Sequence, residues 1–274
     1  MNFINELFSI QNKVTVITGG AGILGSEIAK GLSKAGAKVI ICDIKGFEER
    51  KEEFKKENVE VDAIYIDVLK KEEIEKTCNK ILEKYGKVDV LINAAGGNIK
   101  EATTSKDLSF FDLPLPALEK VIALNLFGGA ILPSQVFGKE MVKNKNGGSI
   151  INVSSMNAFR PLTRIPGYSA AKSAVSNFTQ WLAVHLAQEY NKNLRVNAIA
   201  PGFFLTNQNR YLLLDENGNL TERGKTIIAH TPVGRFGKPE ELIGICIYLS
   251  SEASSFVTGV VIPIDGGFNA FSGV

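Results

Sequence analysis

Cysteine and histidine are scarce in this sequence of 274 residues, which contains 3 cysteines and 2 histidines. Cys42, Cys78 and Cys246 are odd in number and far apart, so they lack the pattern of a disulfide framework. His185 and His230 are also isolated, and none of these residues has the spacing of metal ligands. The sequence therefore predicts free thiols in a reducing compartment and no metal site.

An excess of charge of either sign is also lacking. The chain has 31 basic and 29 acidic residues, a formal net charge of +2 and no dense basic block. This balance gives no reason to expect binding to nucleic acid or to a membrane surface. Residues 1–13 do not resemble a signal peptide, and no apolar run approaches the roughly 18 residues that span a bilayer. We therefore expect a cytoplasmic protein.

What the chain does contain is a regular alternation of short β-branched segments and helical patterns. Strands are expected at 13–18, 38–43, 61–67, 88–93, 149–154, 194–199 and 260–264. Helices are expected at 26–34, 47–57, 72–85, 119–143 and 167–190. Such alternation indicates parallel βαβ units with right-handed crossovers. The prediction is an α/β fold with one domain over residues 1–274, a Rossmann-type doubly wound parallel sheet with helices on both faces.

Two connections are longer than this alternation requires, at about 97–116 and 203–232. Loops of this length that follow strands of a parallel sheet often form lids or walls of a substrate site. We expect that role for both segments, and surface insertion is the alternative.

A glycine-rich turn follows the first expected strand, where residues 18–25 read TGGAGILG. Glycines permit a tight turn and a close approach of backbone N–H groups to phosphate oxygens. The positive end of the following helix attracts the same anion. We expect Gly19, Gly22, Ile23 and Leu24 to hold the phosphates of a dinucleotide, and a purely structural turn is the alternative.

Asp43 ends the second expected strand, and Ile44 follows it. A carboxylate there can accept hydrogen bonds from the ribose hydroxyls of the adenosine half and would repel a 2′-phosphate. Ile44 stands where an arginine could neutralise such a phosphate. NAD is therefore the expected cofactor, although the nearby Lys45 leaves NADP open.

Two further strand ends are expected to border this cofactor. Small residues let the backbone approach a ligand closely, and a carboxylate or an apolar side chain can meet the adenine. The candidates are Asp67 and Val68 after the third strand, and Asn93, Ala94, Ala95 and Gly96 at the end of the fourth.

Tyr168 and Lys172 form a candidate proton-transfer pair. Their i, i+4 spacing places both side chains on one face of a helix. We expect the Lys172 ammonium to favour the phenolate and so to lower the pKa of Tyr168. Ser155 supplies a hydroxyl that can hydrogen-bond the reacting oxygen. This combination suits a carbonyl/alcohol couple.

Over nearly its whole length, the sequence resembles the short-chain dehydrogenase/reductase family. The matching pieces are the glycine turn, Asp67, Asn93–Gly96, Asn125, Ser155, Tyr168 with Lys172, and Pro201-Gly202 with Thr206. The resemblance implies that Tyr168 is the general acid/base and that Lys172 also binds the nicotinamide ribose. It implies that Ser155, in preference to its neighbour Ser154, orients the substrate oxygen.

The same resemblance assigns roles to further residues. Asn125 would hold a water in the proton relay, and Thr206, after Pro201-Gly202, would anchor the nicotinamide carboxamide. Members of the family are usually homotetramers, with the Tyr168 helix in a subunit contact, so a homotetramer or homodimer is expected. One departure is visible: the family pattern has glycine at position 23, where this chain has Ile23. We expect Gly22 to take over the flexible role.

A closer resemblance is to the D-mannonate oxidoreductase (D-fructuronate reductase) branch of the family. The similar strings are SSMNAFRPLTR at 154–164, TQWLAVH at 179–185, APGFFLTNQNR at 200–210, residues 224–238 and the end from Asp265. The branch interconverts a keto-hexuronate and an aldonic acid. Arginine suits a carboxylate and amides suit a polyol, so the substrate candidates are Asn98, Asn157, Arg160, Arg164 and Gln208.

Other functions remain open at this point. A gluconate 5-dehydrogenase-like enzyme would use the same residues. A 3-oxoacyl-carrier-protein reductase-like enzyme normally prefers NADPH, which Asp43 disfavours. A dinucleotide sensor without catalytic activity is less expected, because such proteins commonly lose the tyrosine or lysine that Tyr168 and Lys172 provide.

Overall fold

Seven parallel strands form one sheet in the computed structural model, which describes residues 3–206 and 209–273. The strand order is β3-β2-β1-β4-β5-β6-β7. The strands are β1 (Val14–Thr18), β2 (Lys38–Asp43), β3 (Val61–Tyr65), β4 (Val90–Asn93), β5 (Gly148–Val153), β6 (Leu194–Pro201) and β7 (Val261–Ile264). The order reverses direction between β1 and β4, and a ligand crevice forms at the carboxyl ends of strands at such a point.

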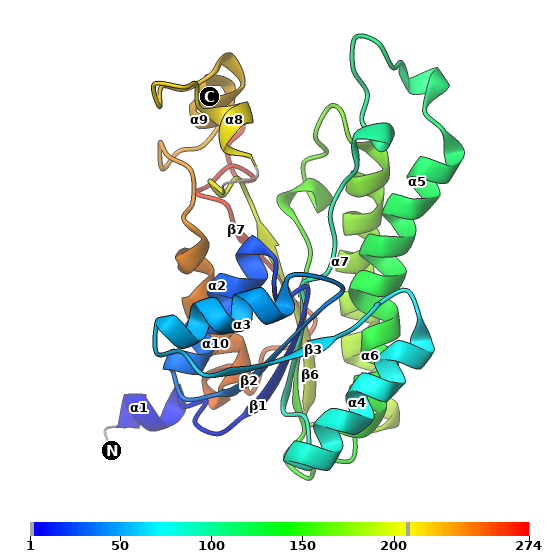
Figure 1. The fold of residues 1–274 in the computed structure, drawn as a ribbon, viewed down its shortest axis with the longest axis vertical. Helices are drawn as coiled ribbons and strands as arrows, with labels where there is room; N and C mark the ends of the chain where they lie inside the picture. The colour runs from blue at the N-terminus through cyan, green and yellow to red at the C-terminus, as the bar shows by residue number, and fades with distance from the viewer. Residues whose placement is uncertain (1–2, 207–208, 274) are drawn as a thin grey trace.

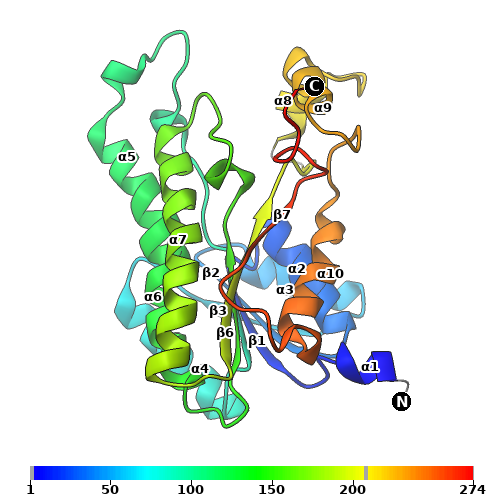
Figure 2. The ribbon, with the colours of Figure 1, turned by 180° about the vertical axis from the view of Figure 1, so that it is seen from behind.

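Helices cover both faces of this sheet (Figures 1 and 2). One layer holds α2 (Ile23–Lys34), α3 (Phe47–Lys56) and α10 (Ile243–Ser250). The other holds α4 (Lys71–Tyr85), α5 (Leu115–Ile122), the π-helical segment η3 (Ala123–Ile131), α6 (Leu132–Met141) and α7 (Pro166–Glu189). Shorter pieces are α1 (Phe3–Leu7), α8 (Arg210–Leu213), α9 (Glu222–Ala229) and the 3₁₀ turns η1 (Lys100–Ala102), η2 (Phe110–Asp112), η4 (Met156–Ala158), η5 (Pro239–Leu242) and η6 (Glu252–Ser254).

Each face of the sheet buries its own apolar cluster. Phe137 of α6 and Ile150 of β5 belong to the cluster under α4, α6 and α7. Ile28 of α2, Ile17 of β1 and Leu249 of α10 belong to the cluster on the other face. A sheet covered on both sides needs strands that are apolar throughout, and all residues of β1, β4 and β6 are buried. The predicted single-domain fold is confirmed.

The element ends differ from the prediction by a few residues. The first long helix begins at Ile23, not at 26, because the end of the glycine turn already enters helical geometry. The helix expected from 119 begins at Leu115, where Pro116 occupies a first-turn position that tolerates the missing N–H. The third strand stops at Tyr65, and the sixth continues to Pro201.

The helix Leu115–Met141 is long and apolar enough to cross a membrane by length and composition, with a mean hydropathy of 1.5. The sequence prediction did not foresee this, because charged residues near both ends interrupt its apolar run. In the fold, 56% of its apolar window is buried, and it packs against α4 and α7. These contacts identify it as a core helix of the domain.

A buried amide network links the sheet to this helical layer. Asn93 of β4 pairs with Asn152 of β5 in the strand register, and its Nδ2 donates to Asn152 Oδ1 at 2.9 Å. Asn93 Nδ2 also donates to Ser134 Oγ of α6 at 3.1 Å. Asn152 Nδ2 donates to Thr179 Oγ1 of α7 at 2.9 Å. Buried polar groups are costly when unpaired, so this network fixes how the two strands and two helices fit together.

Replacing Asn152 by Ala tests that network. The variant N152A leaves Asn93 Nδ2 with one partner fewer and Thr179 Oγ1 without this donor. We expect a loss of about 1–3 kcal/mol in the free energy of unfolding, measured by urea denaturation. The exposed Asn79 on α4 provides the matched control, and N79A should change stability by less than about 0.5 kcal/mol. Equal effects of both substitutions would show that the network adds no stability.

Candidate active site

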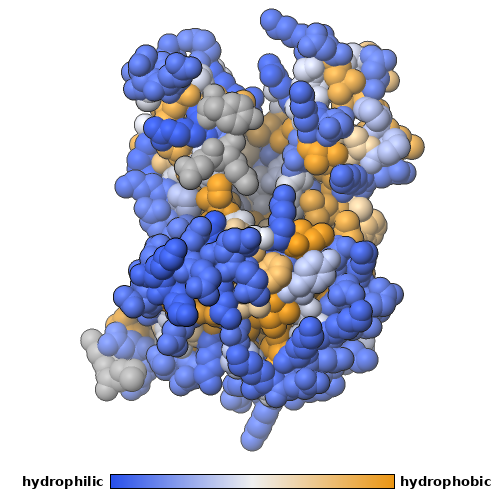
Figure 3. Space-filling model, viewed as in Figure 1, coloured by the Kyte–Doolittle hydropathy of each residue, from blue (hydrophilic) through white to orange (hydrophobic). Residues whose placement is uncertain are grey.

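The carboxyl ends of the strands form the upper edge of the sheet in Figure 1, and two long segments rise from it. Segment 97–116 carries η1 and η2 and leads into α5. Segment 203–232 carries α8 and α9 on the opposite side, and the C-terminal residues lie beside these helices (Figures 1 and 2). Figure 3 shows the surface hollowed between these two projections.

Ser155, Tyr168 and Lys172 come together at this edge. Ser155 follows β5, is buried and accepts a hydrogen bond from Asn157 N at 3.2 Å. Its side chain is also hydrogen-bonded to the Tyr168 phenol. Lys172 lies one turn further along α7, with Nζ 5.6 Å from the centroid of the Tyr168 ring. The serine, phenol and ammonium expected from the sequence are therefore neighbours in space.

Burial controls the ionisation of this cluster. It raises the pKa of Tyr168, and the hydrogen bond from Ser155 opposes that shift. It lowers the pKa of Lys172 from 10.5 to about 8. Burial therefore outweighs any lowering of the Tyr168 pKa by Lys172, and the effect of the ammonium on the phenol stays a prediction. The physical reason is that both groups lose hydration, while the Lys172 ammonium donates to Val153 O at 2.7 Å.

The structure separates the two adjacent serines. Ser154 Oγ lies 2.7 Å from Ser176 Oγ and donates to Lys172 O at 3.1 Å, so it is engaged by α7. Ser155 has extended backbone angles, φ −165° and ψ 155°, and its side chain faces the phenol. Only Ser155 is hydrogen-bonded to Tyr168 among the described residues.

The glycine turn lies against the end of β4. Gly19 has φ +67°, and a Cβ there would come within 2.6 Å of Ala95 N. A Cβ at Gly25 would come within 2.3 Å of Gly19 O. The first helical hydrogen bond of α2 runs from Ser26 N to Gly22 O. The N–H groups of Ile23 and Leu24 therefore belong to the helix start, where an anion can bind.

Gly22 does not take over a flexible role. Its φ is −67° and ψ 164°, angles open to any residue, and it is the N-cap of α2. The left-handed position of the turn is Gly19. Ile23 is accommodated because it is the first residue of a regular helix, which needs no glycine. The expectation for Gly22 is therefore wrong, and Ile23 leaves the turn intact.

Asp43 is fixed beside the same turn. Its Oδ2 accepts a hydrogen bond from Ala21 N at 3.1 Å, and its Oδ1 accepts one from Ile44 N at 2.8 Å. The carboxylate is thus held between the turn and the end of β2 with part of its surface exposed. Ile44 is 54% exposed, so its side chain leaves this edge open to a ligand.

The next strand ends contribute mainly backbone. The Asp67 carboxylate accepts from Leu69 N at 3.1 Å and pairs with Lys70 at 3.3 Å. Val68 is buried against Gly128 of η3, where a Cβ would lie 2.9 Å from Val68 Cγ2. The Asn93 side chain is also buried, in the amide network described above. The backbone of Ala94 and Ala95 adjoins Gly19.

Asn125 closes the loop that follows β4. Its Nδ2 donates to Gly97 O at 2.6 Å and to Val121 O at 2.8 Å, and its Oδ1 accepts from Gly97 N at 3.0 Å. A Cβ at Gly96 would lie 2.6 Å from Asn125 Oδ1 and 3.3 Å from Lys172 Nζ. Gly96 therefore permits the close approach of this loop to Lys172.

Pro201, Gly202 and Thr206 leave the end of β6 at the same edge. Gly202 N donates to Ile264 O at 2.9 Å, and a Cβ at Gly202 would lie 2.6 Å from Asp265 Cβ. Thr206 N donates to Asn209 Oδ1 at 2.8 Å, which shapes the chain before α8. Gln208 lies outside the described residues.

Two of the amides proposed for the substrate have structural contacts instead. Asn157 is buried, and its Oδ1 accepts hydrogen bonds from Leu162 N at 2.9 Å and Ser169 Oγ at 3.4 Å. Asn98 is exposed, and its Nδ2 donates to Thr103 Oγ1 at 2.7 Å and to Ile99 O at 3.1 Å. Asn157 shapes the connection before α7, and Asn98 braces the turn η1.

The two arginines differ in their engagement. Arg160 donates from Nε at 3.2 Å and from a terminal nitrogen at 3.1 Å to Asn269 O, so it holds the C-terminal segment. Arg164 is exposed, and its carbonyl accepts from Thr104 N at 2.9 Å, which joins it to segment 97–116. Its guanidinium has no partner among residues 3–206 and 209–273. Sequence reasoning could not see the tie to Asn269, because the two residues are far apart in the chain.

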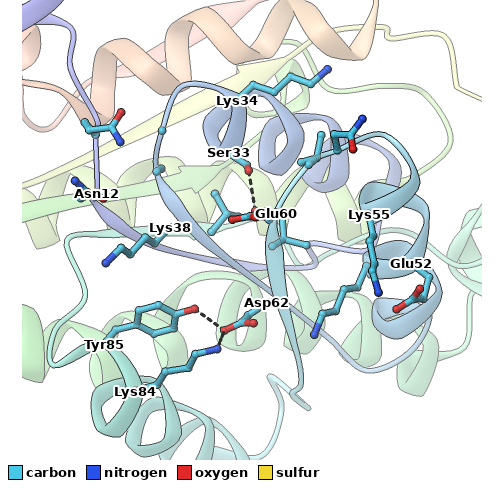
Figure 4. A pocket seen from close by; sticks show the side chains of 18 residues that line it. Asn12, Ser33, Lys34, Lys38, Glu52, Lys55, Glu60, Asp62, Lys84 and Tyr85 are labelled. Atoms are coloured by element: carbon cyan, nitrogen blue, oxygen red, sulfur yellow. Dashed lines mark hydrogen bonds and ion pairs between the residues drawn. The ribbon is translucent and has the colours of Figure 1, made fainter.

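A larger open groove lies at the opposite, amino-terminal edge of β2 and β3 (Figure 4). Lys84 and Tyr85 donate to Asp62 there, and Ser33 Oγ donates to Glu60 O at 2.7 Å. These hydrogen bonds join residues that line the groove to one another. The groove lies away from Tyr168.

The carboxyl edge fits a dinucleotide. Gly22 is exposed and Ile23 and Leu24 are half-buried, so the start of α2 offers N–H groups to a pyrophosphate. The Asp43 carboxylate adjoins the glycine turn, and Lys172 lies at the end of β5. The point at which the strand order reverses, between β1 and β4, lies between these two residues.

A doubly wound sheet with this turn, a strand-end carboxylate and a cluster of a buried serine, a half-buried tyrosine and a buried lysine defines an oxidoreductase that uses a nicotinamide dinucleotide. A family model described as enoyl-(acyl carrier protein) reductase matches residues 20–269. The chain belongs to the short-chain dehydrogenase/reductase family.

Similar proteins include relatives of known and unknown activity. The chain is 46% identical to an uncharacterised oxidoreductase, UxuB, of Bacillus subtilis, over 97% of this chain and 98% of the relative. It is 36% identical to 5-keto-D-gluconate 5-reductase of Escherichia coli, over 96% and 98%. A crystal structure from Haemophilus influenzae, provisionally named D-mannonate oxidoreductase and containing NAD, is 44% identical. It covers 99% of this chain and 100% of its own, with a TM-score of 0.89.

The buried ammonium of Lys172 predicts a pH-dependent stability difference. Its pKa is about 8 in the folded protein and 10.5 as the ordinary value, so the unfolded chain binds more protons between these values. The stability of the wild type should therefore rise with pH in this window relative to K172M. We expect the free energy of unfolding of the wild type, taken relative to that of K172M, to rise by about 3 kcal/mol between pH 7 and pH 11, measured by urea unfolding.

Lys84 provides a control of opposite sign. Its hydrogen bond to Asp62 raises the pKa of Lys84, so its contribution is present at lower pH and is lost as pH rises. The variant K84M should show a small stability loss at pH 7 that disappears at high pH. A K172M difference that does not change with pH would contradict the assignment of a depressed pKa to Lys172.

Proposed function

We propose that this protein is an NAD-dependent oxidoreductase that reduces D-fructuronate to D-mannonate, or catalyses the reverse reaction. The observation that carries the reaction type is the contact of Ser155 and Lys172 with Tyr168 at the carboxyl edge of the sheet. The segments 97–116 and 203–232 are proposed as the walls of the substrate site. Both project from this edge (Figure 1).

In this proposal, Tyr168 is the general acid/base. The bound nicotinamide supplies or accepts the hydride. In the reducing direction, Tyr168 donates its phenolic proton to the carbonyl oxygen, and in the oxidising direction it takes the proton from the alcohol. Burial raises the pKa of Tyr168 and so keeps the phenol protonated at neutral pH, which favours its use as an acid.

Two neighbours assist the proton transfer. Ser155 donates a hydrogen bond to the reacting oxygen and so holds it next to the phenol. Lys172 carries the positive charge that stabilises a phenolate, and its ammonium is placed to bind the nicotinamide ribose. Asn125, through its contacts with Gly97 and Val121, fixes the loop beside Lys172, and we propose that it supports the relay of protons.

The cofactor contacts are proposed along one path. Gly19, Gly22, Ile23 and Leu24 would hold the pyrophosphate at the start of α2. Further along, Asp67 and Val68 would border the adenine, Asn93 to Gly96 would line the path with backbone, and Pro201, Gly202 and Thr206 would meet the carboxamide. Asp43 accepts only two backbone N–H bonds and can bind ribose hydroxyls, which favours NAD.

The substrate class has two kinds of support. The names of two similar proteins, D-mannonate oxidoreductase and 5-keto-D-gluconate 5-reductase, both denote enzymes of sugar acids. The guanidinium of Arg164, which has no partner among the described residues, precedes the Tyr168 helix and suits a carboxylate. Arg160 is proposed to act indirectly, by holding the C-terminal segment over the site.

We also propose a cytoplasmic homotetramer or homodimer. Trp181 and Val184 on α7 are 56% and 57% exposed, and the Trp181 ring stacks on His185 with centroids 4.7 Å apart. An exposed apolar helix face of this kind suits contact with a second copy. Cys42, Cys78 and Cys246 are buried free thiols, as a reducing compartment requires.

Tyr168→Phe tests the catalytic assignment. The variant keeps the ring and removes the proton donor, so kcat should fall by about 10²- to 10⁴-fold while the Kd for NADH stays within twofold. Tyr190, which is 63% exposed at the end of α7, provides the control. Y190F should keep wild-type turnover. Retained turnover in Y168F would refute the role of Tyr168.

The substrate is tested by initial rates of NADH oxidation with fructuronate, tagaturonate, 5-ketogluconate and an acetoacetyl thioester. The highest kcat/KM is expected for fructuronate. A preference for 5-ketogluconate would assign the gluconate 5-dehydrogenase reaction instead. Activity confined to the thioester, with NADPH preferred, would contradict both the sugar-acid and the NAD proposals.

A further inference from the structure

Arg50 on α3 contacts the glycine turn. A terminal nitrogen of its guanidinium lies 3.5 Å from Ala21 O, while the N–H of the same Ala21 donates to Asp43 at 3.1 Å. Arg50 and Asp43 therefore contact the same residue of the turn. This brings a positive charge to the turn residue that also holds the Asp43 carboxylate.

Arg50 is only partly satisfied in this position. Its Nε is buried and has no hydrogen-bond partner among the described residues. Its long contact to Ala21 O is at the limit of a hydrogen bond. Arginine usually fills its donors with planar anionic groups, and the Arg50 side chain is 31% exposed, so the accessible part of its guanidinium is suited to a phosphate.

Glu53 holds this guanidinium from the other side. The Arg50 and Glu53 side chains form an i, i+3 ion pair at 2.6 Å, with exposures of 31% and 55%. The carboxylate neutralises Arg50 and competes with any other anion for its donors. Because the pair is partly exposed, it is weak enough to be opened by a stronger anion.

We propose that Arg50 is the residue that would meet a 2′-phosphate on the adenosine ribose, and that Glu53 restrains it. The Arg50–Glu53 pair then acts together with Asp43 to set the preference for NADH over NADPH. This inference rests on the proposed dinucleotide function. Arg50 and Glu53 lie beyond the end of β2, so Asp43 and Ile44 alone do not reveal their role in specificity.

The test is the dissociation constants of NADH and NADPH, measured by calorimetry on the full chain without substrate. In E53Q the charge that restrains Arg50 is removed with little change of shape. The Kd for NADPH should fall by about three- to tenfold, as expected for a freed charge-assisted contact, and the Kd for NADH should stay within twofold. In the double variant E53Q/R50M this gain should disappear.

Glu52 provides the matched control. It is exposed on the same helix but lines the groove at the opposite edge of the sheet (Figure 4). The variant E52Q removes the same charge from α3, and its effect on the Kd for NADPH should be less than twofold. Equal effects of E52Q and E53Q would mean that general charge, rather than the pair with Arg50, controls the affinity.

Other outcomes would also decide the matter. If R50M weakens NADH and NADPH equally, Arg50 supports the adenosine site without reading the 2′ position, and the inference is overturned. Unchanged affinities in E53Q, with NADH still bound, would overturn it while leaving the proposed function in place. If the wild type binds neither nucleotide, the proposed function fails, and this inference fails with it.

Discussion

The paired amides of Asn93 and Asn152 are the contact on which the rest of the site depends. They join β4 to β5 in the middle of a parallel sheet and extend the connection to α6 and α7 through Ser134 and Thr179. β4 ends at the cofactor path, and β5 ends at Ser155. A one-residue slip between these strands would turn every side chain to the other face and separate the two halves of the site.

The ionisation of the site depends on how far the sheet and its helices exclude water from it. Ser155, Tyr168 and Lys172 are held at the strand ends with little water around them, so burial shifts the phenol and the ammonium toward their neutral forms. Burial therefore opposes the phenolate that the neighbouring Lys172 ammonium favours. The charge of this ammonium must be retained by further partners, and Val153 O is one of them.

Much of the fold and of the catalytic cluster could be predicted from the sequence. Strands such as β1 are runs of consecutive apolar residues that can be seen in the sequence. Tyr168 and Lys172 need only helical spacing to share a face. The sequence did not reveal contacts that join distant residues. Arg160 holds Asn269 instead of standing free, Asn157 pins the connection before α7, and Asn93 turns into the core. The i, i+3 spacing of Arg50 and Glu53 is visible in the chain, but its proximity to Ala21 is not.

The sequence by itself determined the βαβ alternation, the position of the glycine turn and the order of Ser155, Tyr168 and Lys172, because each is a local pattern along the chain. Only the tertiary structure decided which glycine takes the left-handed conformation, which serine faces Tyr168, and in which direction the pKa values move. These properties depend on burial and on partners far away in the chain. Ala95 against Gly19 and Ser176 against Ser154 are such partners, and the folded sheet alone brings them into contact.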